Sequence, residues 1–122
     1  TAKQYYNVEV GSSSSSTTDS VKIGLMYVSD YGYTASQSAW ATSLSEYFLE
    51  AYNSNWLYLG NIEWTITPVS SNSTYVFLLV DNGGYDGADA NYGCAVRPAF
   101  YLNSNVSYVS GDGSQSNPFR IN

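Results

Sequence analysis

Apolar positions recur with the period of an α-helix in one segment of this chain. Within residues 37–52, apolar side chains at positions i, i+4, i+7, i+8 and i+11 share one helical face: Trp40, Leu44, Tyr47, Phe48 and Ala51. Ser36 precedes them and is a residue type that caps helix N-termini. The pattern therefore predicts one main helix over about residues 37–52.

Shorter apolar runs on both sides of this segment have the pattern of β-strands. Ile62, Trp64 and Ile66 alternate with polar residues, which predicts a strand with a buried apolar face. Pro98 cannot donate a backbone hydrogen bond, so its run is expected at a sheet edge or bulge. The predicted strands cover residues 21–28, 56–60, 62–68, 73–81 and 96–103, with a last short strand and a tight turn within 105–121.

The N-terminal segment differs in character from the rest. Its weak alternation at Tyr6, Val8 and Val10 predicts an edge strand, and the Ser-rich run that follows buries nothing and indicates a linker. We therefore expect an N-terminal edge strand and Ser-rich linker over residues 1–20 and a compact domain over residues 21–122. One helix with several short strands predicts an α+β fold with long irregular loops, in which the N- and C-terminal strands lie close together.

Charge narrows the classes of partner. The 122 residues carry 4 basic and 10 acidic side chains, a formal charge of -6, and no His. Phosphate binding needs clustered Lys and Arg, so nucleic acid and anionic lipid are not expected partners. Only 11% of the residues are charged, so solubility has to come from Ser, Thr, Asn and Tyr, a surface common in exported proteins.

Cysteine content and hydropathy set further bounds. Cys94 is the only cysteine in the sequence, so it cannot form an internal disulfide and is expected to be a small buried hydrophobe. The longest apolar run, residues 76–80, is far too short to cross a bilayer. We expect an extracellular or cell-surface location, or a phage particle, with the export signal or anchor outside these residues.

Catalysis and metal binding receive little support from the sequence. General acid–base chemistry at neutral pH most often uses His, which is absent. An EF-hand loop that starts at Asp81 does not fit, because its third and fifth positions need oxygen ligands and are occupied by Gly83 and Tyr85. A looser calcium site stays open beside the simpler interpretation of a polar turn, and its ligands would be Asp86, Asp89 and Asn91.

Aromatic residues carry the main functional signal. Thirteen tyrosines and three tryptophans exceed what a small core needs, and several tyrosines fall among Gly, Asn and Asp. Tyr gives rigid contact area while small polar residues adapt around it, as in many binding surfaces, although a plain tyrosine-rich surface is an equal alternative. The loop expected over residues 81–93 is the predicted ligand-binding face, through Asn82, Tyr85, Asp86, Asp89, Asn91 and Tyr92.

Another group of residues is expected to stabilise the fold. Arg97 lies between two apolar runs, where a guanidinium needs a carboxylate or several carbonyl groups around it. Arg97 and Asp30 are therefore predicted structural residues, and the candidate partners of Arg97 are Asp30, Glu46 and Glu50. The three tryptophans lie on periodic apolar faces and are predicted core residues: Trp40, Trp56 and Trp64.

Three blocks of the chain resemble a known family: KIGLMYVSDYGYTAS over residues 22–36, NWLYLGNIEWTITP over 55–68, and YGCAVRPAFYLNSNVSYVSGDGSQSNPFRI over 92–121. They are similar to a domain of surface, pilin-like and phage-associated proteins of gut Firmicutes. That family resembles the C-type-lectin-like fold of formylglycine-generating enzymes and of the variable proteins of diversity-generating retroelements. The resemblance implies a twisted antiparallel sheet that presents irregular loops for ligand display.

The chain also departs from relatives of that fold. Calcium-dependent lectins of the fold use Glu-Pro-Asn or Gln-Pro-Asp with Trp-Asn-Asp, and none of these occurs here. The oxidising enzymes of the fold use a cysteine pair, whereas Cys94 is alone. In the diversified relatives the variable positions cluster late in the chain, which corresponds here to residues 74–93.

Together these features predict a non-catalytic adhesion or recognition module with a face that diversification could vary. It would be monomeric in isolation and would bind a protein or glycan on a host or bacterial surface, without a metal or cofactor. The alternative is a structural subunit or tip domain of a pilus-like fibre, and self-association separates the two. A sugar-processing enzyme is a third interpretation, which needs a carboxylate pair in a cleft.

Overall fold

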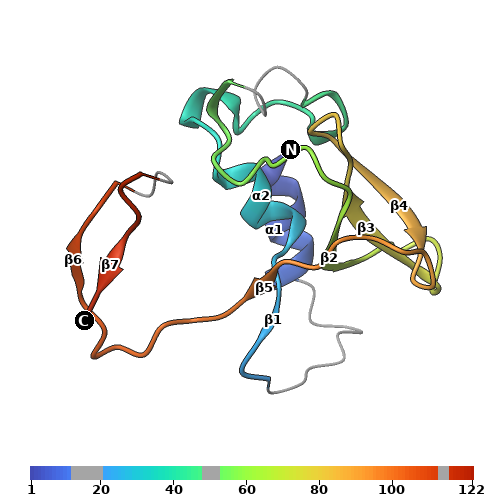
Figure 1. Ribbon diagram of the computed structural model, residues 1–122. Helices are drawn as coiled ribbons and strands as arrows, with labels where there is room; N and C mark the ends of the chain where they lie inside the picture. Colours follow the sequence, from blue (N-terminus) through green and yellow to red (C-terminus); the bar gives the residue numbers. More distant parts are fainter. Residues whose placement is uncertain (12–20, 48–52, 113–115) are drawn as a thin grey trace.

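In a computed structural model of the protein, the described residues are 1–11, 21–47, 53–112 and 116–122. They form an α+β structure with short antiparallel sheets, as predicted (Figure 1). The helical elements are α1 (Ala2–Gly11), α2 (Val28–Tyr33) and the 3₁₀ turns η1 (Gln37–Ala39) and η2 (Leu44–Glu46). The strands are β1 (Gly24–Leu25), β2 (Glu63–Pro68), β3 (Tyr75–Leu79), β4 (Tyr85–Asp89), β5 (Pro98–Ala99), β6 (Tyr108–Ser110) and β7 (Arg120–Ile121).

The N-terminal segment is a helix, so the predicted edge strand is wrong. Thr1 and Gln4 form a capping box: the Thr1 hydroxyl accepts from the Gln4 N–H at 3.3 Å, and the Gln4 side-chain oxygen accepts from the Thr1 nitrogen at 2.7 Å. Ala2, Tyr5 and Glu9 then lie on the face toward the body. The three apolar residues that alternate are exposed on the helix surface. Packing of one helix face therefore outweighs a weak strand pattern.

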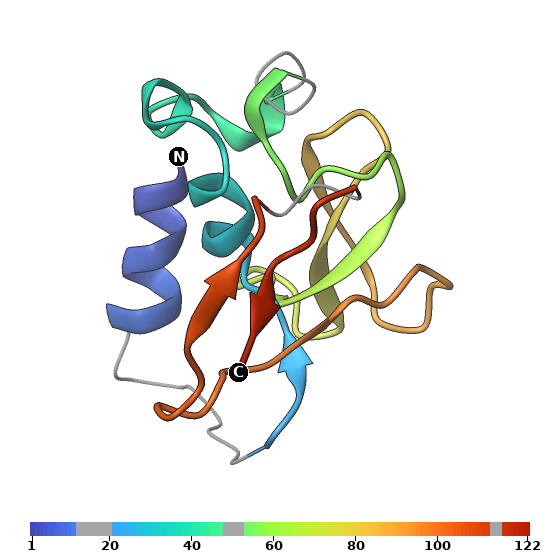
Figure 2. The same ribbon diagram turned by 60° about the vertical axis from the view of Figure 1, so that its left-hand side comes forward.

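Helices α1 and α2 pack side by side, and a glycine sets their distance (Figure 2). Ala2 is fully buried against Gly32 of α2. A Cβ atom on Gly32 would lie 2.7 Å from the Cβ of Ala2, closer than real Cβ atoms approach. The close contact of α1 with the body therefore depends on the missing side chain at residue 32.

Residues 37–47 do not form the predicted main helix, and residues 48–52 lie outside the described residues. The described part consists of η1 and η2, although the period identifies two core residues correctly, Leu44 and Tyr47. The hydroxyl groups of Ser43 and Ser45 lie 2.8 Å apart and bond to each other. Short hydroxyl side chains compete with helical structure through such local hydrogen bonds, which favours turns over a continuous helix.

The central sheet has the order β2–β3–β4 and is antiparallel throughout. Strands β2 and β3 confirm the predictions for residues 62–68 and 73–81, whereas residues 56–60 do not form a strand. The expected loop over residues 81–93 is also partly wrong, because it contains β4. Gly83 has φ 89°, a value that glycine adopts without strain, and it allows the tight turn between β3 and β4.

Strand β2 buries the face opposite to the predicted one. Glu63, Thr65 and Thr67 are only 1–3% exposed, whereas Ile66 is 43% exposed. The buried polar groups have partners: the Thr65 hydroxyl donates to the Phe77 carbonyl at 2.7 Å, and the Thr67 hydroxyl donates to the Glu9 carboxylate. The predicted alternation of buried and exposed residues is therefore correct, but the polar positions are the buried ones.

The predicted strand over residues 21–28 shortens to β1, because α2 begins at Val28. Strand β1 pairs with β5, where Pro98 lies at an edge as expected. The chain before β5 also runs beside β2, since the Ala95 N–H donates to the Ile62 carbonyl at 2.9 Å. This segment therefore connects β1 and β2 to the C-terminal part of the chain.

Strands β6 and β7 form a hairpin that stands away from the rest of the molecule (Figure 1). Tyr108 pairs with Ile121, and its ring contacts Phe119 edge to face at 6.1 Å. The expected proximity of N- and C-terminal strands is therefore wrong: β7 pairs with β6, and the N-terminal segment is α1.

The buried Thr67 hydroxyl gives the first prediction, because it connects three elements. It donates to Glu9 of α1 and accepts from the Val28 N–H of α2 at 3.0 Å. Thr67→Val leaves both groups without this partner, so we expect a loss of about 2 kcal/mol in the free energy of unfolding. Urea unfolding measures it. Thr74→Val is the matched control, because the Thr74 hydroxyl bonds in an exposed position. Equal losses would contradict the buried role of Thr67.

Candidate functional site

A groove of about 380 Å³ lies between α1 and the central sheet. This volume falls in the range of small-molecule sites, roughly 300–1,000 Å³. Residues from five parts of the chain line it, among them Gln4 and Tyr5 of α1, Ser43, Ser70, Phe77 of β3 and Tyr85 of β4. We call it the α1 groove.

Three aromatic rings form one wall of the α1 groove, and we call Tyr5, Phe77 and Tyr85 the aromatic trio. Their ring centroids are 5.2–5.4 Å apart, and each pair meets edge to face at 69–88°. This is a preferred geometry of aromatic pairs and fixes the rings against one another. The trio also packs against the hydrophobic core, so the wall is rigid.

The aromatic trio carries two hydroxyl groups into the groove wall. Burial, followed by a hydrogen bond between the side chains of Tyr5 and Tyr85, raises the pKa of Tyr5 well above its ordinary value. The Tyr5 hydroxyl therefore stays protonated at physiological pH and both donates and accepts hydrogen bonds. Ser43, Ser70 and Gln4 add hydroxyl and amide groups around the rings.

The α1 groove has no charged lining side chain in the part of the chain that the structure describes. This contrasts with the sequence as a whole, which has a formal charge of -6. The α-amino group of Thr1, which is also in the lining, is already bonded to the Gln4 side chain at 2.7 Å. A charged ligand would therefore lose hydration without gaining an opposite side-chain charge, which is costly. The lining therefore favours a neutral ligand with hydroxyl groups and apolar surfaces.

The structure separates the six predicted ligand-binding residues. Tyr85 lies in the α1 groove, and Asp86 points to the opposite face of β4 because strand residues alternate. Asn82 lies in the turn before β4, where its side-chain oxygen accepts from the Gly84 N–H at 3.1 Å. Asp86 is exposed and accepts from the Gly87 N–H at 2.7 Å.

The other three predicted residues gather at the far end of β4. The carboxylate of Asp89 accepts from the Asn91 N–H at 3.2 Å and from the Thr74 hydroxyl at 3.2 Å. Tyr92 follows in a turn and is 56% exposed. The five residues of β4 separate this end from Asn82 by about 16 Å. The six residues therefore do not form one continuous face, and Tyr85 is the member that lines a groove.

The open question of a calcium site concerns Asp86 and Asp89. They are three residues apart on β4, so their side chains leave opposite faces of the strand. Among the described residues, no group of three His, Cys, Asp or Glu side chains is arranged to hold a metal ion. Asp86 and Asp89 therefore do not face one bound ion together.

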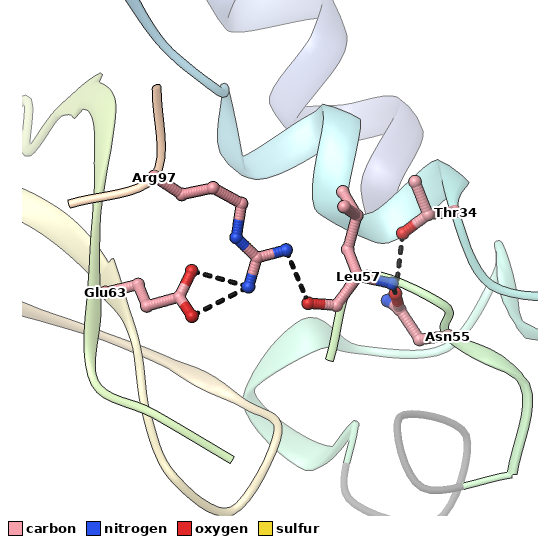
Figure 3. Close-up of polar contacts among 5 residues, drawn as sticks. All are labelled: Thr34, Asn55, Leu57, Glu63 and Arg97. Carbon is pink, nitrogen blue, oxygen red and sulfur yellow. Dashed lines mark hydrogen bonds and ion pairs between the residues drawn. The ribbon is translucent and has the colours of Figure 1, made fainter. Parts of the chain in front are cut away.

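Arg97 forms a clamp with Glu63 and the Leu57 carbonyl group (Figure 3). Its Nη1 donates to the Leu57 carbonyl at 2.7 Å. Its Nη2 lies 2.7 Å from both carboxylate oxygens of Glu63, and it donates a well-aligned hydrogen bond to Oε1. The Glu63 side chain is 4% exposed and that of Arg97 is 24% exposed.

The same clamp continues into α2 through Asn55 (Figure 3). The Asn55 side-chain oxygen accepts from the Leu57 N–H at 2.9 Å and from the Thr34 hydroxyl at 2.6 Å. The Asn55 amide donates to the Tyr31 carbonyl at 2.8 Å. Arg97 therefore ties β2 and the segment before it to the end of α2.

The partner of Arg97 differs from the prediction. Asp30 instead accepts from the Tyr27 N–H at 2.9 Å at the start of α2, and Glu46 lies in η2. Glu50 is outside the described residues. Glu63 was missed because it alternates with apolar residues that looked buried. A lone arginine between apolar runs was the available signal that some buried carboxylate had to be present.

The predicted core residues have different degrees of exposure. Trp40 and Trp64 are half-buried, and Trp40 donates to the Ala35 carbonyl at 3.1 Å. Trp56 is 72% exposed, so its assignment to the core is wrong. Cys94 is half-buried instead of buried, and desolvation raises the pKa of its thiol.

Comparisons with family models, with curated proteins and with solved structures find no match to this chain. Within the described ranges, no helix has the length and hydropathy that a membrane crossing requires. The α1 groove therefore has to be interpreted from its own chemistry.

Proposed function

We propose that this protein is a recognition module that binds a neutral saccharide in the α1 groove. The observation that carries this assignment is the lining itself: a rigid aromatic wall surrounded by hydroxyl and amide groups, with no charged side chain among the described lining residues. Aromatic rings cover the apolar C–H faces of a sugar ring, and the surrounding groups exchange hydrogen bonds with its hydroxyl groups. A non-catalytic role agrees with this lining.

The wider assignment is a C-type-lectin-like domain of a bacterial or phage surface protein, acting in adhesion. Its support is the resemblance of residues 22–36, 55–68 and 92–121 to that family, together with the α+β class of the structure. The exposed polar end of β4, near Asp89 and Tyr92, falls in the segment that corresponds to the variable region of the relatives. That end is a second place for contacts with a larger ligand.

Binding is tested with an array of neutral and anionic oligosaccharides. We expect the protein to bind a subset of neutral structures and to leave sialylated and sulfated ones unbound. Tyr85→Phe removes one hydroxyl and keeps the ring, and we expect it to weaken binding by about 3–10-fold, the effect of one hydrogen bond. Isothermal titration calorimetry with the best array ligand measures the change.

Tyr92→Phe is the matched control, because it removes the same atom from an exposed tyrosine outside the α1 groove. We expect it to bind like the original protein. Conservative replacement is needed at Tyr85, because its ring packs on Tyr5 and Phe77 and Ala would also destabilise the fold. Absence of saccharide binding, or equal losses in both variants, would reject the assignment.

A structural subunit or tip domain of a pilus-like fibre is the second candidate function. The specific observation in its favour is the exposed C-terminal segment, where Tyr101 is 98% exposed and the β6–β7 hairpin has exposed residues on both strands. Such a segment suits contacts with another subunit. Growth of assemblies without a fixed size would favour this candidate.

A further inference from the structure

The C-terminal arm, residues 100–112 and 116–122, has the apolar content of core strands and packs against little of its own chain. Seven of its large apolar side chains are more than half exposed: Phe100, Tyr101, Leu102, Tyr108, Val109, Phe119 and Ile121. Of its described residues, only Val106 and Gly111 are partly buried. Figure 1 shows the hairpin at the end of an extended connection, away from the body. A two-stranded hairpin alone is marginally stable in water.

One face of the hairpin is apolar. Tyr108 pairs with Ile121 across the two strands, and its ring contacts Phe119. Two backbone hydrogen bonds of 3.0 Å between Ser107 and Asn122 also hold the two strands of the hairpin together. A preformed unit therefore presents three apolar side chains on one side.

A second groove, beside β1, fits this unit. It has a volume of about 480 Å³, and its lining includes Val21, Leu25, Tyr27, Asp30, Ile66 and Phe100. We call it the β1 groove. Val21 is 61% exposed and Ile66 is 43% exposed, so the groove leaves apolar surface open to solvent. Its two charged lining side chains, Lys22 and Asp30, have opposite signs, so the described lining carries no net side-chain charge.

Charge and area favour a second copy of this chain as the occupant. Asp112 and Arg120 are the only charged side chains of residues 100–122, so the formal charge of -6 lies on residues 1–99. Residues 1–99 of two copies repel each other because both are acidic. The arm has no net charge, so it approaches residues 1–99 of another copy without this repulsion. Tyr108 and Phe119 lie on the hairpin, whereas Phe100 and Tyr101 line the β1 groove; these four are 62–98% exposed and present on the order of 500 Å² together, which each partner buries in a reciprocal exchange. With the aliphatic side chains this approaches the ~800 Å² per partner of a standard interface.

We propose that the β6–β7 hairpin of one copy docks in the β1 groove of a second copy, with Tyr108, Phe119 and Ile121 in the groove. This interaction is independent of the saccharide site, because the α1 groove lies on other residues. It differs from the expectation of a monomer in isolation, so association by itself does not separate a recognition module from a fibre subunit, whereas growth without a fixed size does. A reciprocal exchange produces a closed pair, and one-way docking produces a chain of copies.

Light scattering after size-exclusion chromatography, over a 100-fold range of protein concentration, tests the docking. We expect the mass to rise with concentration to at least twice that of one chain. The triple variant Tyr108→Ser, Phe119→Ser and Ile121→Ser should weaken association at least 10-fold, and its exposed positions leave the body intact. Tyr92→Ser, an exposed tyrosine outside both grooves, should associate like the original protein.

A mixing experiment identifies the groove. Ile66→Asp blocks the β1 groove and leaves the hairpin, so it should not associate alone. Mixed with the triple hairpin variant, which keeps its groove, it should form a complex with one copy of each. A monomer at all concentrations, with the hairpin amides protected from hydrogen exchange, means that the arm folds onto its own body and overturns the docking. Association that the triple variant leaves unchanged also overturns it.

Discussion

Replacement of Arg97 by Ala is expected to lower the free energy of unfolding by about 3 kcal/mol. The variant leaves the carboxylate of Glu63 buried without its cation, and Glu63 is only 3% exposed. It also removes the hydrogen bond to the Leu57 carbonyl, which holds the segment before β2 against α2. Loss of one partner of a buried ion pair costs more than the pair contributes, because the desolvated charge remains.

Urea unfolding of matched variants separates this mechanism from a general effect of losing arginine. Arg120→Ala removes an exposed arginine and should change stability by less than about 0.5 kcal/mol. Arg97→Leu combined with Glu63→Leu removes both charges and should recover at least half of the loss. A loss below about 1 kcal/mol in Arg97→Ala would show that Glu63 is solvated or paired elsewhere.

The second large effect is expected from Gly32→Val, with a loss of about 2–3 kcal/mol in the free energy of unfolding. Any Cβ at this position would meet the Cβ of Ala2 at 2.7 Å and the side chain of Leu44 at 3.2 Å. Helix α1 has to move away from α2 to make room. That movement also displaces Tyr5 and opens the α1 groove, so saccharide binding should weaken with stability.

Gly93→Val is the control for this substitution, because nothing lies within 4 Å of the position that its Cβ would occupy. Thermal unfolding followed by near-ultraviolet circular dichroism measures both variants. Similar melting temperatures for Gly32→Val and the original protein would mean that residues 2–11 do not pack on α2. The assignment of α1 as the wall of a binding groove would then fail as well.

Local patterns predicted where several strands lie along the sequence. The alternating run around Trp64 and the apolar run around Phe77 correspond to β2 and β3, and Pro98 lies in the edge strand β5. The helical period around Leu44 found two buried residues, although the local conformation is 3₁₀. These features need information only from neighbouring residues.

Features that depend on distant partners were not predicted. The buried face of β2 is polar because Arg97, 34 residues away, pairs with Glu63, and because Glu9, 58 residues away, accepts from Thr67. Without these partners the apolar face would be the better one to bury. Helix α1 had a local signal, the Thr1-Ala2-Lys3-Gln4 capping box, which the alternation of exposed apolar residues obscured.

The candidate site was predicted only through one residue. A surplus of tyrosines beside Gly, Asn and Asp pointed to Tyr85, but the other wall of the groove comes from α1, at the opposite end of the sequence. The pairing of Tyr5 with Tyr85 requires the helix to pack across the sheet. Composition cannot indicate such an arrangement, because it contains no information on which segments meet.

The most direct test of the neutral-saccharide groove is a titration of the ¹⁵N-labelled protein with a panel of neutral oligosaccharides, followed by amide chemical shifts. We expect the largest shift changes at Gln4, Ser70 and Tyr85, which line the α1 groove from three separate segments. Largest changes confined to Asp89, Asn91 and Tyr92 would place binding at the far end of β4 and contradict the assignment. Absence of changes with every member of the panel would contradict saccharide recognition itself.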